Sequence, residues 1–422
     1  MCLPRIYDPR RSGISAKMRS RFSRRANKQR PIAHAIVFAA LSMLASATAF
    51  GAPYRPIKDA TVLVTVPKSA ASVQSELRRS QNQLAAHPDD LPAALELARL
   101  AIRDGRANAD PRRYGQAQAA LGSWWSDPNA PMEVRVLRAI IRQSLHDFTG
   151  AEADLNAILT ADPKNGQARL TRAFIRQTIG ELAAAKEDCR SLPPSVGLTA
   201  AAVCLLRAEA LTGSSEKALQ RLNQVLMIDG RAEPQVRRWA QAVAAEMAMM
   251  LGQSEAADRS FAEATGDGSG DIPTLVAMAD HFLDTGRPQE VLTLLADRSE
   301  ADIVYLRLAI AGKALNDPRT AHWMTLLDER FAAASASGVQ LHLREEARFE
   351  LEVKDNASAA LQLSLANWRV QKEPGDARLV LQAALAAHQP VAAHEVLDFI
   401  ENMGLVDMRI EPLKDKIKTE RS

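Results

Sequence analysis

The string GDGSGD at positions 266–271 places oxygen-bearing side chains at the spacing of a calcium-binding loop. Asp267, Ser269 and Asp271 stand at the first, third and fifth positions of such a loop, which supply ligands. The sixth position requires Gly for a sharp turn but holds Ile272, and the twelfth requires a bidentate Glu but holds Met278. We therefore interpret the string as a connection between helices.

Other residue combinations that carry out chemistry are missing from the sequence. The eight histidines follow no metal-ligand spacing, and there is no HExxH or CxxC motif. No glycine-rich phosphate loop occurs, and no serine stands in a GxSxG context. We expect no catalytic, cofactor-binding or metal-binding residues, and a protein that is not an enzyme.

The composition favours helices over strands. Of the 422 residues, 47% are hydrophobic but only 5% are aromatic, and alanine is abundant. Small side chains suit helices whose backbones approach closely, whereas the β-branched and aromatic runs of a β-rich protein are absent. The composition therefore predicts an all-α protein with a large core.

The charge is distributed unevenly along the chain. Residues 1–30 carry ten Lys or Arg and one Asp, a net +9, so the remaining residues must sum to −6 to give the total of +3. A mildly acidic body is not typical of a protein that binds a phosphate backbone. We expect no nucleic-acid partner.

The N-terminal region has the pattern of an export signal. The apolar stretch 35–44 has the length of a signal-peptide core and is short for a membrane span. Ala47, Thr48 and Ala49 follow it as a small-x-small cleavage site. We expect residues 1–49 to be a signal peptide, with Met18 as an alternative start, and no membrane span after its removal. The sequence thus predicts a periplasmic or secreted protein of a bacterial envelope, with an uncleaved anchor as the alternative.

A repeat of about 34 residues runs through most of the chain. The segments VRVLRAIIRQSLHDFTGAEADL and ARLTRAFIRQTIGELAAAKEDC align so that Ala139 and Ala151 fall on Ala173 and Ala185, each 34 residues later. Four glycines precede new apolar segments at spacings of 33, 39 and 34: Gly180, Gly213, Gly252 and Gly286. This pattern is typical of helix–turn–helix units, in which small residues stand where two helices cross and glycine ends the first helix.

These positions resemble the tetratricopeptide repeat. The resemblance implies an α-solenoid of about nine units, preceded by a short extended segment and covering about four-fifths of the chain. The expected units are 90–130, 131–164, 165–195, 198–231, 234–268, 272–300, 302–335, 341–373 and 376–403. Residues 50–68, which include the strand-like DATVLVTVP, form the extended linker, 69–403 the superhelix and 404–422 a polar cap. The element DPRRYGQAQAALGSWW also resembles secreted bacterial members of uncharacterised function.

The resemblance implies a binding site on the concave face, which the first helix of each unit lines. The expected groove residues are Val136, Ile140, Gln143, Leu170, Phe174, Gln177, Val203, Arg207, Glu246 and Met249, and equivalent positions hold Trp239, Ala242, Val276 and Asp280. An alternative is that some of these residues pack internally. The groove positions are largely apolar, which disfavours the Lys/Asn carboxylate clamp of chaperone-binding members and suits a peptide segment.

The expected function is therefore a scaffold that binds a partner protein or peptide in its groove without catalysis. The alternative is a cryptic enzyme, or an enzyme-associated subunit, in envelope polysaccharide handling or envelope assembly.

Cys189 and Cys204 are a possible disulfide. They fall near the end of one predicted helix and about two turns into the next, which runs antiparallel after a turn at 191–197. The two positions are offset by roughly 6 Å along the helices at about 1.5 Å per residue, which favours two buried, reduced cysteines. Export favours the bridge instead, because oxidising compartments join cysteines within reach.

The first prediction is processing after Ala49. The intact mass of the exported protein should correspond to a chain that begins at Phe50, because the small-x-small site follows the apolar stretch directly. A mature chain that still carries residues 31–49 would contradict this and support the anchor.

Overall fold

The computed structural model describes residues 68–266, 270–296, 298, 300–336 and 342–420. The described residues contain helices and no strand, which confirms the all-α prediction. Those from Val73 onward belong to one compact unit. The expected signal peptide, the strand-like segment 59–67 and residues 267–269 of the calcium-like string lie outside the described residues.

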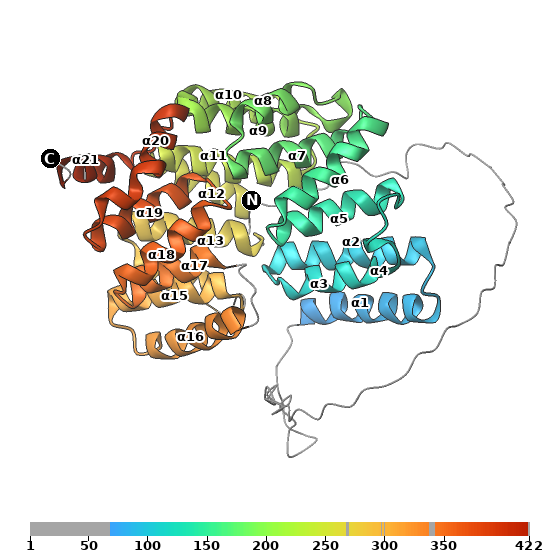
Figure 1. The fold of residues 1–422 in the computed structure, drawn as a ribbon, viewed down its shortest axis with the longest axis horizontal. Helices are drawn as coiled ribbons and strands as arrows, with labels where there is room; N and C mark the ends of the chain where they lie inside the picture. The colour runs from blue at the N-terminus through green and yellow to red at the C-terminus, as the bar shows by residue number, and fades with distance from the viewer. Residues whose placement is uncertain (1–67, 267–269, 297, 299, 337–341, 421–422) are drawn as a thin grey trace, which may run out of the picture. The chain divides into compact units, whose positions relative to one another are not determined.

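The chain consists of consecutive helical hairpins, which lie side by side in the order of the sequence (Figure 1). The first six pair α2 (Leu91–Asn108) with α3 (Arg112–Ala120) and α4 (Gly122–Trp125), α5 (Met132–Ser144) with α6 (Phe148–Ala161), α7 (Gly166–Ile179) with α8 (Leu182–Arg190), α9 (Leu198–Glu209) with α10 (Ser215–Ile228), α11 (Pro234–Met250) with α12 (Ser254–Thr265), and α13 (Ile272–Asp284) with α14 (Pro288–Leu295). The last three pair α15 (Asp302–Leu315) with α16 (Thr320–Ala336), α17 (Leu343–Arg348) and its continuation η4 (Phe349–Val353) with α18 (Ala357–Trp368), and α19 (Pro374–Ala386) with η5 (Pro390–Ala393) and α20 (His394–Met403).

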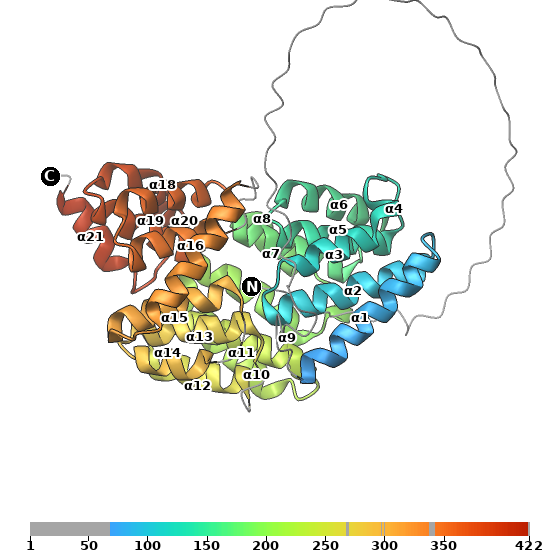
Figure 2. The same ribbon diagram turned by 90° about the horizontal axis from the view of Figure 1, so that it is seen from below.

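The nine expected units are therefore confirmed, and the fold is an α-solenoid of tetratricopeptide type. The first helices of successive hairpins contact one another, from α2 with α5 through to α17 with α19. In the part of the chain that the structure describes, α1 (Lys68–Ala86) precedes the hairpins, lies beside α2 (Figure 2) and packs against it through the buried Leu77. At the other end, α21 (Glu411–Glu420) packs on α19 and buries Ile417.

Alanine sets how closely the helices pack. The four aligned alanines, Ala139, Ala151, Ala173 and Ala185, are all completely buried, as are Ala218 and Ala257 at equivalent positions. No larger side chain fits where two backbones approach in a close-packed interior. This explains why small residues recur at the repeat spacing.

Turn chemistry fixes where the helices begin and end. Asp147 and Asn165 cap the starts of α6 and α7 by accepting hydrogen bonds from the backbone N–H groups of Gly150 and Ala168. Gly180 ends α7 with φ +88°, a left-handed conformation that glycine adopts without strain. A side chain there would also collide with the ring of Phe399.

The late hairpins pack against the inner side of earlier ones. The backbone N–H of Lys372 donates to the carbonyl oxygen of Thr178 at 2.7 Å, and the N–H of Met408 donates to that of Met250 at 2.8 Å. Helix α2 also contacts α13, although four hairpins lie between them in the sequence. Inner-face residues in the middle of the chain are therefore covered by other parts of it.

The second prediction concerns the helix crossing at Ala185. Replacing Ala185 by Leu should lower the free energy of unfolding by roughly 1–3 kcal/mol, because the added atoms have no room between α7 and α8. Chemical denaturation of the variant measures this. Ala183→Leu on the exposed face of the same helix is the matched control and should change stability little. Equal effects of the two substitutions would contradict the packing argument.

Candidate functional site

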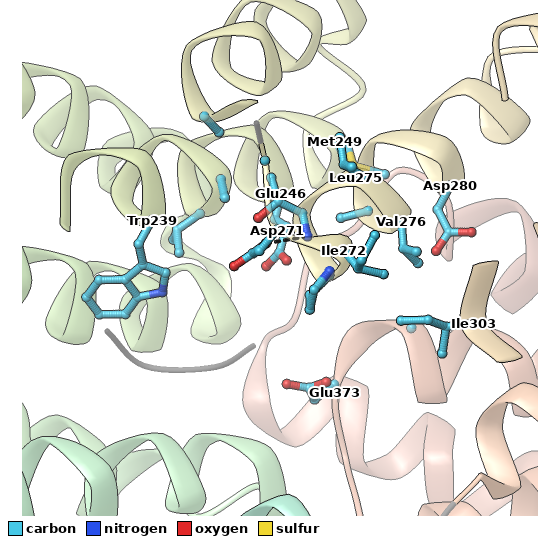
Figure 3. Close-up of a pocket in the computed structure, with 18 of the residues that line it drawn as sticks. Trp239, Glu246, Met249, Asp271, Ile272, Leu275, Val276, Asp280, Ile303 and Glu373 are labelled. Atoms are coloured by element: carbon cyan, nitrogen blue, oxygen red, sulfur yellow. Dashed lines mark hydrogen bonds between the residues drawn. The ribbon is translucent and has the colours of Figure 1, made fainter. Parts of the chain in front are cut away.

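A cavity of about 840 Å³ lies among the first helices of the hairpins. Its lining residues come from α2, α9, α11, α13, α15, α17 and the start of α19 (Figure 3). This volume is typical of sites that enclose a small molecule or a short segment of another chain. The cavity is therefore the candidate binding site.

Helix α11 presents one continuous face to the cavity. Trp239, Ala242, Glu246 and Met249 line it, at spacings of three, seven and ten residues from the tryptophan. These spacings bring side chains back to the same face of an α-helix. The face combines an aromatic ring, a carboxyl group and a thioether within three turns.

Trp239 has an unsatisfied polar group. Its side chain packs against Phe174 with ring centroids 5.3 Å apart, and the residue is only 8% exposed. The indole Nε1 is buried and has no hydrogen-bond partner among the described residues. Figure 3 shows the nitrogen-bearing edge of the ring on the side of the cavity where Glu246 and Asp271 lie. A donor is thus available at the cavity wall.

Glu246 lies two turns further along α11. In the part of the chain that the structure describes, its carboxyl group accepts no hydrogen bond and forms no ion pair. Burial raises the pKa of this carboxyl, although the positive charge of Arg207 opposes the effect. The Glu246 carboxyl group is thus a hydrogen-bond acceptor available on the same wall.

The neighbouring wall is electrostatically satisfied. Arg307 donates two hydrogen bonds to the Asp280 carboxylate, at 3.0 and 2.7 Å, and Arg348 donates a third at 2.8 Å. Burial alone would raise the pKa of Asp280, but the two guanidinium groups outweigh it and hold the pKa well below its usual range. These groups hold α13, α15 and α17 together.

A second buried network joins hairpins that are far apart in sequence. Arg207 of α9 donates to Glu373 and to the side-chain oxygen of Gln177, each at 2.9 Å. Arg344 of α17 donates to the other oxygen of Glu373 at 3.0 Å and pairs with Asp376. Burial opposes ionisation of Glu373, but Arg344 and Arg207 hold its pKa well below its usual range. The network therefore fixes the start of α19 against α9.

Three of the expected groove residues line the cavity: Arg207, Glu246 and Met249. The equivalent positions Trp239, Ala242, Val276 and Asp280 line it too. Most of these residues belong to the fifth and sixth hairpins, and their role in binding stays a prediction.

The other expected groove residues do not line the cavity. Ile140, Leu170, Phe174, Gln177 and Val203 are buried, and they do not line the cavity. Val136 and Gln143 are partly buried and also lie outside its lining. The physical reason is that inner-face residues of the third and fourth hairpins are covered. Phe174 packs on Trp239, and Gln177 donates to the carbonyl oxygen of Cys204 at 3.1 Å.

Several lining residues were not foreseen from the sequence. Among them are Ile303, Arg344 and Glu373. They belong to hairpins in which the repeat pattern is faint or to contacts between segments far apart in sequence, so the repeat pattern did not indicate them. Arg103 and Arg238 are exposed at the lining. Only the alignment of stronger units could have suggested these positions, and no local signal marks Glu373.

Of the two alternatives for Cys189 and Cys204, the structure has the disulfide, whereas the helix offset had favoured two reduced cysteines. Their Cα atoms are 5.5 Å apart, within the usual range for a bridge. The offset expected between the two cysteines along the helices is absent, because the connection between α8 and α9 is longer than a tight turn and contains η2 (Pro194–Val196). We infer that α9 starts beyond the end of α8, so that Cys204 comes level with Cys189.

The calcium-like string does not provide a described metal site. Asp271 caps α13, where its side chain accepts a hydrogen bond from the backbone N–H of Thr274 at 2.9 Å. Asp267 and Ser269 lie outside the described residues. Over the described ranges, no cluster of three or more His, Cys, Asp or Glu side chains is placed to hold a metal ion. None of the helices described has the length and apolar character needed to cross a membrane.

Comparisons with solved structures find helical-repeat proteins. The chain is similar to a tetratricopeptide repeat protein from Parabacteroides merdae, with 16% identity over 56% of this chain and 93% of that chain and a TM-score of 0.36. It is also similar to a chain of the Cut9–Hcn1 hetero-tetramer of the APC/C (12% identity, 78% of this chain and 63% of that chain, TM-score 0.45) and to yeast Tom70 (12%, 84% and 85%, TM-score 0.38).

These likenesses have low identities and TM-scores, so they transfer no partner or activity to this chain. No protein-family model matches the sequence, and no curated protein matches it. The assignment of the fold rests on the nine hairpins and their shared packing positions.

The third prediction concerns the disulfide. Replacing Cys189 and Cys204 together by Ala should lower the free energy of unfolding by about 3 kcal/mol, because the bridge closes a loop of 15 residues. Denaturation of the oxidised protein and the double variant measures the difference. Peptide mapping without reductant should show the two cysteines in one cross-linked peptide. Alkylation of both thiols in protein taken from its native compartment would contradict the bridge.

Proposed function

We propose that the protein is an exported, non-catalytic scaffold that holds a segment of a partner protein in the cavity. The observation that carries the proposal is the cavity of about 840 Å³, lined by the first helices of hairpins from both ends of the described chain. A pre-formed cavity needs little reorganisation to bind, so less of the interaction energy is lost on ordering.

The chemistry of the lining favours a peptide segment over a purely apolar ligand. Met249, Ile272, Val276 and Ile303 supply apolar contacts, and Met247 is a further thioether. Methionine side chains adapt to different shapes, which suits the side chains of a bound peptide. Trp239 and Glu246 supply a hydrogen-bond donor and acceptor beside them, as a backbone and its side chains require.

The disulfide supports the exported location in this proposal. Disulfides persist in oxidising compartments and are rare in the reducing cytosol. The Cys189–Cys204 bridge agrees with the signal-peptide pattern of residues 1–49. Absence of catalysis remains part of the proposal because the sequence carries no recognised catalytic motif.

The fourth prediction tests binding in the cavity. The chain beginning at Phe50 is immobilised and used to capture proteins from envelope extract, with mass spectrometry to quantify each protein retained. Ala242→Phe places a ring inside the cavity lining and should reduce retention of the specific partner by at least about tenfold. Thermal unfolding must first show that this variant is folded.

Met227→Phe is the control. Met227 is 75% exposed near the end of α10 and does not line the cavity, so the substitution should leave retention unchanged. Equal retention by the wild type and both variants would show that the cavity is not the binding site. Retention of no protein above the level of a blank surface would contradict the scaffold function.

A further inference from the structure

Two polar groups on one face of α11 have no hydrogen-bond partner within the described chain. Trp239 offers a buried N–H, and Glu246 offers a carboxyl group that forms no described hydrogen bond or ion pair. Buried donors in folded proteins are nearly always paired. The Trp239 N–H is buried, whereas Glu246 is only partly buried, so its carboxyl group is open to a ligand in the cavity. A ligand that pairs with both groups would complete this face of α11.

The arginines of the lining that could pair with the Glu246 carboxylate have other partners. Arg207 pairs with Glu373, Arg307 pairs with Asp280, and both arginines are almost completely buried. Arg409 pairs with Asp407 at 2.6 Å. The cations nearest to the carboxyl groups of the lining are thus already engaged.

Three further arginines of the lining lie in a different environment. Arg103, Arg238 and Arg298 are exposed, and water and salt screen an exposed charge far more than one inside the cavity. They provide no contact to the Glu246 carboxyl among the described interactions. Glu246 therefore remains the acid of this wall that an external cation can reach and pair with.

The spacing of the two groups sets the size of the ligand. Seven residues of helix separate Trp239 from Glu246, which is about 10 Å along the axis at about 1.5 Å per residue. An extended peptide covers this distance in about three residues, at about 3.3 Å per residue. A short extended segment can therefore engage both groups at once.

We propose that the cavity recognises a cationic nitrogen group of a peptide segment, which donates to the Glu246 carboxylate while an oxygen about three residues away accepts from the Trp239 N–H. This inference rests on the proposed scaffold function and names the class of segment that the scaffold holds. The cation comes from a lysine or arginine side chain or from a free amino terminus. An ion pair between such a group and a partly buried carboxylate is a charge-assisted hydrogen bond, stronger than one between neutral groups.

The apolar part of the lining fits the same class of ligand. Ile272, Val276 and Met249 line the same cavity as Glu246 (Figure 3). The methylene groups of a lysine or arginine side chain can pack on such a surface while the charged end reaches the carboxylate. An acidic side chain would meet the Glu246 charge at short range and be disfavoured.

The fifth prediction uses acetylated, amidated hexapeptides in a positional library with Lys, Arg, norleucine or Glu at one position, and a matched set with a free amino terminus. Binding to the chain beginning at Phe50 is measured by fluorescence polarisation at low salt. Peptides with a cation should bind at least about tenfold tighter than those with norleucine or Glu. Comparison of the acetylated and free sets distinguishes a side-chain cation from the amino terminus.

Variants locate the cation. Glu246→Gln keeps the size of the side chain but removes the charge, so cationic peptides should lose at least about tenfold in affinity and neutral peptides should not. Trp239→Phe should weaken all peptides by roughly threefold to tenfold, because the N–H donor is removed together with part of the aromatic surface. Glu255→Gln is the matched control, since Glu255 is exposed on α12 outside the cavity lining. Thermal unfolding of each variant checks that it is folded.

The outcomes separate this inference from the function on which it rests. Cavity-dependent peptide binding with no preference for a cation, or with full affinity in Glu246→Gln, would overturn the inference and leave the scaffold function standing. Selection of acidic peptides would overturn it as well. Failure of every peptide and of every envelope protein to bind would remove the proposed function and the inference together.

Discussion

The buried ion pair between Arg207 and Glu373 joins two parts of the solenoid that are 166 residues apart in sequence. Each partner is further engaged, Arg207 with Gln177 and Glu373 with Arg344. Removing one member of such a network leaves the others buried and unpaired, which is strongly destabilising. Because the disulfide lies next to Gln177, whose amide contacts Cys189 Sγ at 3.8 Å, covalent and electrostatic constraints act on the same helices.

This constraint decides which inner-face residues remain available to a ligand. Where α19 and the connection before it pack against α7 and α9, as at the backbone hydrogen bond from Lys372 to Thr178, the inner side is filled by the chain itself. Further along, the α11 and α13 faces instead border the cavity. A solenoid whose repeats are alike in sequence thus presents different environments at equivalent positions, because long-range contacts differ from hairpin to hairpin.

The sequence was sufficient to predict the hairpins because their determinants are local. Ala151 and Ala185 mark helix crossings 34 residues apart, and Asp147 or Gly180 mark helix ends, so each unit can be recognised from its own residues. Exposure on the concave face depends on contacts with distant hairpins. Leu170 and Glu246 occupy groove positions in the same alignment, yet the first is buried in the core and the second lines the cavity. No pattern within a unit distinguishes the two.

The paired charges of the cavity walls and the unpaired groups of α11 have different effects on ligand binding. The walls formed by Asp280 with Arg307, and by Glu373 with Arg207 and Arg344, satisfy their own charges and hold the cavity open without a ligand. Helix α11 borders the same cavity and carries two polar groups, of Trp239 and Glu246, that have no partner within the described chain, at a free-energy cost that the surrounding contacts must offset. A ligand that pairs with both groups recovers this free energy on binding, whereas a purely apolar ligand leaves it unrecovered. Selectivity in such a cavity therefore comes from the unpaired groups of α11, and the paired arginines of the other walls determine its shape.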